Sequence, residues 1–195
     1  MNFKSLVQGI TQSLNWHKER RHTFASMVIG LIDQKNVQHH AFSKSLNTEA
    51  TVKSKLERIR RFFKGQAIDY EAFSLQLVMT IFKKIPKMDL ILDRTNWKFG
   101  KQDVNYLVLA CKVGSVTFPL FWSLLDHQGC SDFEQRKILL EKFKNTFGFN
   151  CIKSFTADRE FIGRDWFSYL CQNNVPFLSA LRTTNWCNGD VVRGP

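Results

Sequence analysis

The hydrophobic pattern of this chain changes its period near residue 87. Before that point the apolar residues recur every three or four positions, which is the spacing of amphipathic helices. After that point they gather in short continuous runs bounded by turn-forming residues, which is typical of strands. We therefore predict an all-α N-terminal domain over residues 1–87 and an α/β domain over residues 88–195.

The N-terminal region is predicted to contain four or five helices. One of them is expected to begin at a cap provided by Asn47 or Thr48 and to end at Gly65. The apolar stripe that this helix should bury comprises Val52, Leu56, Ile59 and Phe63. The other helices are expected over about 6–14, 24–32, 37–46 and 69–84.

The C-terminal region is predicted to have the element order βββαβαβ. Short links between the first three strands favour an antiparallel meander. The segment Ser131-Asp132-Phe133-Glu134 has the form of a capping box and predicts a helix that ends at Gly148. Strands are expected at 90–93, 106–113, 117–125, 152–156 and 177–181, with a second helix at 164–172.

The basic residues are concentrated in the N-terminal region. Residues 1–87 hold fifteen Lys and Arg against six Asp and Glu, which accounts for +9 of the formal net charge of +11. Clustered cations favour a nucleic-acid partner, because they release the counterions condensed on phosphates. The helix that ends at Gly65 follows a turn, as in a helix-turn-helix, although a solvated charged face is the other interpretation. The candidate DNA contacts are Lys53, Lys55, Arg58, Arg60, Arg61 and Lys64.

Composition argues against a membrane protein and against a disulfide-rich one. No apolar run is long enough to span a bilayer, and residues 1–10 lack the layout of a signal peptide. The five cysteines are odd in number and never spaced as C-x-x-C, so they indicate neither a disulfide framework nor a zinc knuckle. We expect a cytoplasmic protein.

Two aspartates directly follow predicted strands. Asp93 ends the first strand, and Asp158 comes just after the fourth. A strand that returns through a helix runs parallel, so the fourth strand can lie beside the first with both carboxyl ends at one edge. Paired carboxylates suit Mg²⁺, a hard cation that prefers oxygen ligands, and Mn²⁺ can replace it. An aspartate after a strand is also a common turn or cap residue, so the pattern alone leaves both interpretations open.

The segments Leu90-Ile-Leu-Asp93-Arg-Thr-Asn-Trp97 and Thr156-Ala-Asp158-Arg-Glu-Phe-Ile-Gly163 resemble the first two acidic segments of bacterial insertion-sequence transposases of the IS-four type. Those are DDE enzymes, and the resemblance covers most of the chain. It implies a ribonuclease H-like core, with Asp93 and Asp158 as catalytic metal ligands for Mg²⁺-dependent DNA cleavage and strand transfer. It also implies a nucleoid-associated protein that binds transposon ends.

The third carboxylate of that family is a Glu in the pattern Tyr-x-x-Arg-x-x-x-Glu-x-x-x-x-x-x-Lys, and this sequence contains no such pattern. We therefore expect the N-terminal portion of a transposase, with an incomplete core and little strand-transfer activity of its own. The alternative is a non-catalytic DNA-binding module that regulates transposition, as a homodimer or paired with full-length transposase. A third option is a stand-alone nuclease of ribonuclease H-like fold that uses Glu160 as an extra ligand.

Overall fold

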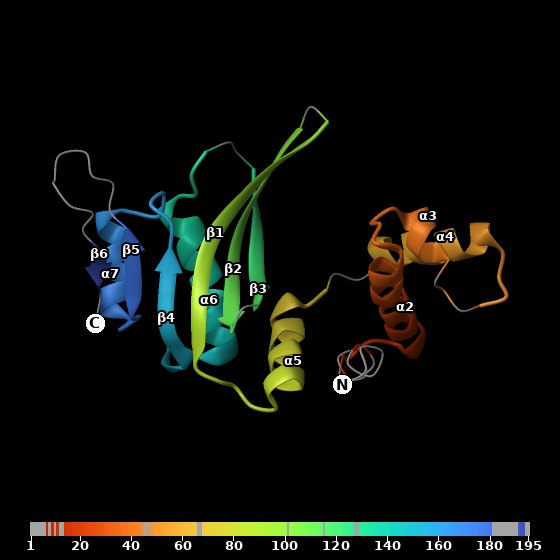
Figure 1. Cartoon of the computed structure of the whole chain (residues 1–195), viewed down its shortest axis with the longest axis horizontal. Helices are drawn as coiled ribbons and strands as arrows, with labels where there is room; N and C mark the ends of the chain where they lie inside the picture. Colours follow the sequence, from red (N-terminus) through yellow and green to blue (C-terminus); the bar gives the residue numbers. More distant parts are fainter. Residues whose placement is uncertain are drawn as a thin grey trace. The chain divides into compact units, whose positions relative to one another are not determined.

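The structure is a computed structural model that describes residues 7, 9, 11, 14–44, 46, 48–65, 68–100, 102–114, 116–126, 129–180 and 191–193. The chain divides into two compact units, Met1–Lys83 and Lys84–Pro195. Figure 1 traces the elements of each unit. Among the described residues, no helix is both long enough and apolar enough to cross a membrane.

The elements described in the first unit are helices. The helix predicted over residues 6–14 falls largely outside the described residues. The helix predicted over 37–46 is only five residues long. The bounds are α2 (Lys18–Gln34), α3 (His39–Ser43), α4 (Val52–Lys64) and α5 (Tyr70–Phe82).

Helix α4 begins later than predicted. Its N-cap is Thr51, whose Oγ1 accepts a hydrogen bond from the Ser54 amide at 3.3 Å. The predicted cap at Asn47 or Thr48 is therefore wrong. The predicted end is confirmed, because Gly65 is the C-cap and its amide donates to the Phe62 carbonyl.

The buried stripe of α4 also differs from the prediction. Ile59 and Phe62 are buried, whereas Val52 and Phe63 are 54% and 57% exposed. The Phe62 ring stacks on Phe24 of α2, with ring centroids 5.9 Å apart. The spacing of apolar residues predicted the burial of Ile59 but does not distinguish Phe62 from Phe63, and it is Phe62 that contacts the ring from α2.

The second unit contains a six-stranded mixed sheet with the strand order β3-β2-β1-β4-β5-β6 (Figure 1). The first three strands form the predicted antiparallel meander, while β1 and β4, like β4 and β5, run parallel. The predicted α/β class and element order are confirmed, and β6 is an additional antiparallel strand. The strands are β1 (Met88–Phe99), β2 (Gln102–Val113), β3 (Val116–Leu125), β4 (Ile152–Ala157), β5 (Phe177–Ala180) and β6 (Val191–Arg193).

Strand β1 is far longer than the predicted 90–93. It continues to Phe99 and forms a hairpin with β2 that turns at Gly100, where φ is +62°. Four of the six residues from Arg94 to Phe99 are polar, so their hydrophobic pattern gives little indication of a strand. Pairing with β2 extends the strand regardless. Asp93 therefore lies within β1 and not at its end, which corrects the prediction.

Two helices pack on one face of this sheet. They are α6 (Phe133–Phe147) and α7 (Arg164–Gln172), and the short 3-10 helix η1 (Phe149–Cys151) leads from α6 into β4. Phe147 of α6 lies 6.2 Å from Phe121 of β3, and Trp166 of α7 lies 6.0 Å from Phe155 of β4, measured between ring centroids. The core of the second unit lies between the sheet and these helices.

The capping box of α6 is present one residue later than predicted. Asp132 Oδ1 accepts from the Gln135 amide at 2.8 Å, and the Gln135 side chain accepts from the Asp132 amide at 3.0 Å. Ser131 and Glu134, which were the predicted pair, do not form it. The Ser131 hydroxyl instead accepts from Arg136.

We expect Asp132→Ala to lower the free energy of unfolding by about 1 kcal/mol, because it leaves the first amides of α6 without their acceptor. Chemical denaturation followed by circular dichroism measures this change. Glu134→Ala is the matched control, since Glu134 makes only an exposed ion pair with Lys137 at 3.8 Å. Equal losses in the two variants would contradict the assignment of the cap.

Candidate functional site

The register of the parallel strands aligns the two aspartates. The last residue pair between β1 and β4 is Leu92 with Ala157; Asp93 is the next residue of β1, and Asp158 is the first residue after the end of β4. Both aspartates are exposed. The sheet thus brings together two residues that are 65 positions apart in the sequence, as predicted from the crossover connection.

Asp93 lies on the face of the sheet opposite α6 and α7, which we call the aspartate face. Side chains alternate along a strand, and Leu90 and Leu92 point into the core beneath the helices. Asp89 lies on the aspartate face and accepts a hydrogen bond from Ser154 of β4 at 2.7 Å. Asp93 lies four residues further along β1, so alternation places it on this face, and Asp158 comes four residues after Ser154, directly beyond the end of β4.

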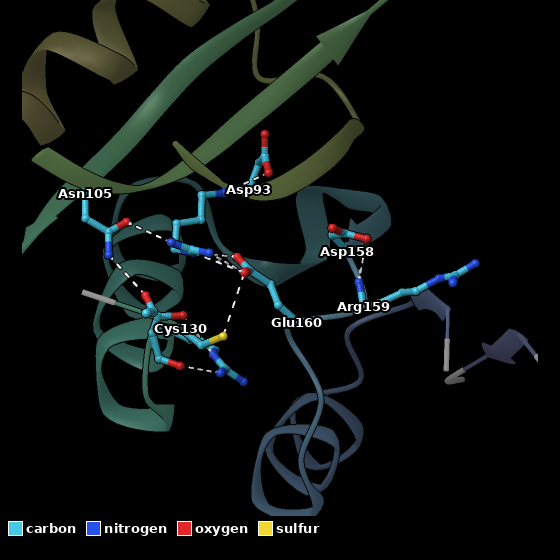
Figure 2. Close-up of polar contacts among 10 residues, drawn as sticks. Asp93, Asn105, Cys130, Asp158, Arg159 and Glu160 are labelled. Carbon is cyan, nitrogen blue, oxygen red and sulfur yellow. Dashed lines mark hydrogen bonds and ion pairs between the residues drawn. The ribbon is translucent and has the colours of Figure 1, made fainter. Parts of the chain in front are cut away.

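Each carboxylate uses one oxygen for a local hydrogen bond. Asp93 Oδ1 accepts from the Arg94 amide at 2.8 Å, and Asp158 Oδ1 accepts from the Arg159 amide at 2.6 Å (Figure 2). These contacts orient the carboxylates, and among the described residues no hydrogen bond engages the second oxygen of either, which leaves it for another partner. Two exposed carboxylates in adjacent register fit the oxygen preference of Mg²⁺ or Mn²⁺, with water completing the shell. Among the described residues, no group of three or more acidic, His or Cys side chains is placed to hold a metal ion.

Glu160 is held by an arginine. Arg94 Nε donates to Glu160 Oε1 at 2.9 Å, and Arg94 Nη2 donates to Oε2 at 2.8 Å, which is a bidentate ion pair (Figure 2). The two side chains are only 19% and 15% exposed. Hydrogen bonds to Glu160 raise the pKa of Arg94 above its usual value. Glu160 is thus already neutralised within the protein, which disfavours its use as an extra metal ligand.

Further polar contacts support this ion pair. Asn105 of β2 is buried, accepts from Arg94 Nη1 at 3.4 Å and donates to the Gly129 carbonyl at 3.1 Å. The Cys130 thiol lies 3.8 Å from Glu160 Oε2. Sequence reasoning missed this cluster. Its one signal is that Arg94 shares the core-facing alternation of Leu90 and Leu92, where a charged side chain requires a partner.

A second arginine, Arg136 of α6, contacts the segment that follows Asp158. Arg136 of α6 is buried, donates through Nε to the Ser131 hydroxyl at 3.0 Å and through Nη1 to the Ile162 carbonyl at 3.3 Å. Its guanidinium also lies over the Phe161 ring, 5.5 Å from the centroid. Burial lowers the pKa of Arg136. These contacts tie the segment after Asp158 to the start of α6.

The six predicted DNA contacts are not equivalent in α4. Arg58 is partly buried and is engaged by Glu19, 2.5 Å away, and by Thr23 at 2.8 Å, so it joins α4 to α2. Lys55 is also partly buried. The members that are exposed are Lys53, Arg60, Arg61 and Lys64.

Another carboxylate on the aspartate face serves a structural purpose. Asp89 accepts from Ser154 and lies 3.3 Å from Lys153 Nζ. The hydrogen bond from Ser154 is the main cause that lowers the pKa of Asp89. Because its oxygens are occupied by neighbours on β4, Asp89 differs from Asp93 although both lie on the same strand and the same face.

Comparison with models of protein families gave no match, and comparison with curated proteins gave none either.

Proposed function

We propose that the second unit is the metal-binding core of a ribonuclease H-like DNA strand-transfer enzyme, and that the chain is a transposase of the IS-four type or a portion of one. The observation that carries the proposal is that Asp93 and Asp158 directly follow Leu92 and Ala157, the last residue pair between the parallel strands β1 and β4. The order βββαβαβ, with the first strand beside the fourth, agrees with what the sequence resemblance implies.

The proposed roles follow from the chemistry of the side chains. Asp93 and Asp158 would hold Mg²⁺, or Mn²⁺ in its place, through their free oxygens. A divalent cation at this position would supply Lewis-acid stabilisation of the phosphoryl oxygens of DNA during cleavage. The two carboxylates would position the cation, and the amides of Arg94 and Arg159 hold the carboxylates in place.

DNA binding is assigned to the first unit. The exposed residues of α4 that carry the proposal are Lys53, Arg60, Arg61 and Lys64. The local charge of +9 in residues 1–87 favours phosphate contacts over a merely solvated face. We propose transposon ends as the DNA partner, in a homodimer or together with full-length transposase.

We expect this chain alone to have little strand-transfer activity. Only two of the family's three carboxylates have counterparts here, and the ion pair with Arg94 leaves Glu160 unsuited to replace the third. This observation favours the second candidate function, a non-catalytic DNA-binding module that regulates transposition. It weighs against the stand-alone nuclease.

A plasmid assay separates the two candidates. The whole chain is incubated with supercoiled DNA in Mg²⁺ or Mn²⁺, and nicking is followed on a gel, while DNA binding is measured in parallel. Weak nicking that requires the cation and disappears in Asp93→Ala and Asp158→Ala identifies an enzyme. DNA binding without nicking, unchanged by either substitution, identifies the module.

A further inference from the structure

We propose that the Arg94–Glu160 ion pair is a positioning device, which holds the segment that carries Asp158 against β1 and thereby sets the spacing of the two aspartates. Arg94 and Glu160 are positioning residues in this proposal and do not bind the cation themselves. The inference rests on the proposed metal site at Asp93 and Asp158.

The ion pair connects β1 to the Asp158 segment just beyond the point where β1 and β4 stop pairing. Pairing between β1 and β4 ends at Leu92 and Ala157, so no strand pairing between β1 and β4 fixes Asp158 relative to Asp93. Arg94 follows Asp93 by one residue, and Glu160 follows Asp158 by two. Among the described residues, their bidentate contact is the next connection between β1 and the segment that follows β4.

The guanidinium end of this connection is itself held in place. Arg94 lies on the core-facing side of β1 and contacts Asn105 of the neighbouring strand β2, which in turn donates to the Gly129 carbonyl. On the other side, the Phe161 amide donates to the Asp158 carbonyl at 3.0 Å, which closes a turn that includes Glu160. Movement of Glu160 therefore moves Asp158, while Arg94 stays fixed to the sheet.

Because Arg94 is positively charged, a positioning role and a purely electrostatic role predict opposite changes in metal affinity when Arg94 is replaced. A positive side chain next to a cation site repels the cation, so its removal should strengthen metal binding if electrostatics alone decided the outcome. A positioning role predicts the opposite, because loss of the ion pair frees the turn and disturbs the ligand geometry. Loss of an outer partner of a metal ligand typically weakens metal affinity by about 10–100-fold.

The test measures Mn²⁺ affinity of the whole chain by electron paramagnetic resonance, in which free Mn²⁺ gives the signal. Arg94→Gln and Glu160→Gln are each expected to weaken affinity about 10-fold or more. Arg159→Gln is the matched control, since it removes a positive side chain beside Asp158 but keeps the backbone amide from which Asp158 accepts, and its affinity should be unchanged or slightly tighter. The reversed pair, Arg94→Glu with Glu160→Arg, should recover part of the loss.

Thermal unfolding of each variant is recorded alongside, and affinities are compared well below each melting temperature. A lower melting temperature with unchanged Mn²⁺ affinity would show a purely structural ion pair and overturn the proposal. Weaker binding in Glu160→Gln with tighter binding in Arg94→Gln would overturn it as well, because the two charges alone would produce that pattern.

If Asp93 and Asp158 do not bind the cation at all, the Mn²⁺ measurements give a different result. If the unmodified chain binds no Mn²⁺, or if Asp93→Asn leaves the affinity unchanged, the proposed function fails and this inference fails with it. If Asp93→Asn abolishes binding while Arg94→Gln and Glu160→Gln retain it, the metal site stands and only the positioning role is wrong.

Discussion

Asp93→Asn and Asp158→Asn are each expected to weaken Mn²⁺ binding by at least about 30-fold. Each substitution removes a negative charge from the site, and the attraction between unit charges 4 Å apart is about 1 kcal/mol in water and about 4 kcal/mol near a protein surface. The attraction doubles for a divalent ion, so a loss of about 2 kcal/mol is the lower bound, which corresponds to roughly 30-fold in affinity. Isothermal titration calorimetry with the whole chain measures it.

Asp89→Asn is the matched control for these variants. Asp89 is a carboxylate on the same strand and face as Asp93, but its oxygens accept from Ser154 and face Lys153. We expect its Mn²⁺ affinity to stay within about 3-fold of the unmodified chain, because Asp89 pairs with Lys153 and lies four residues from Asp93, about 13 Å along the strand, where charges are largely screened. Equal losses in Asp89→Asn and Asp93→Asn would point to nonspecific attraction of the cation by the face as a whole.

The combined substitution Arg60→Ala and Arg61→Ala is expected to weaken DNA binding about 10-fold or more at physiological salt. Both side chains are exposed on α4. Each phosphate contact contributes about 0.9 to the slope of log affinity against log salt, so the slope should become shallower by about 1.8. Fluorescence anisotropy with duplex DNA at several salt concentrations gives both quantities.

Protein stability should change little in this variant. Arg60 makes an exposed ion pair with Glu57, 2.5 Å away, and such pairs contribute at most about 1 kcal/mol. Lys137→Ala with Lys144→Ala removes two charges from α6 of the second unit, where both lysines pair with glutamates, and serves as the control. Unchanged affinity and slope in the Arg60/Arg61 variant would remove α4 from the DNA interface.

Local patterns in the sequence were sufficient to predict the order of the elements in the second unit and the pairing of two distant aspartates. Apolar runs identify strands that are buried on at least one face, and the handedness of crossovers then places β4 beside β1. The alignment of Asp93 with Asp158 follows from those two rules, although Asp93 proved to lie within β1.

Features that depend on long-range packing were not predictable in this way. The extension of β1 beyond Asp93 is paired with β2 residue by residue, whereas only Trp97 and Phe99 of its own residues are apolar. The burial of Phe62 in place of Phe63 depends on a ring of α2. Likewise, the partner of Arg94 is 66 residues away, and no spacing rule connects it to Glu160.

The central claim is that Asp93 and Asp158 together bind a divalent cation, and the most direct test is a crystal structure of the whole chain soaked in Mn²⁺. The account predicts an anomalous difference peak within about 2.2 Å of one carboxylate oxygen from each aspartate. A peak bound by only one of them, a peak at Asp89 or Glu160 instead, or no peak at all would contradict it.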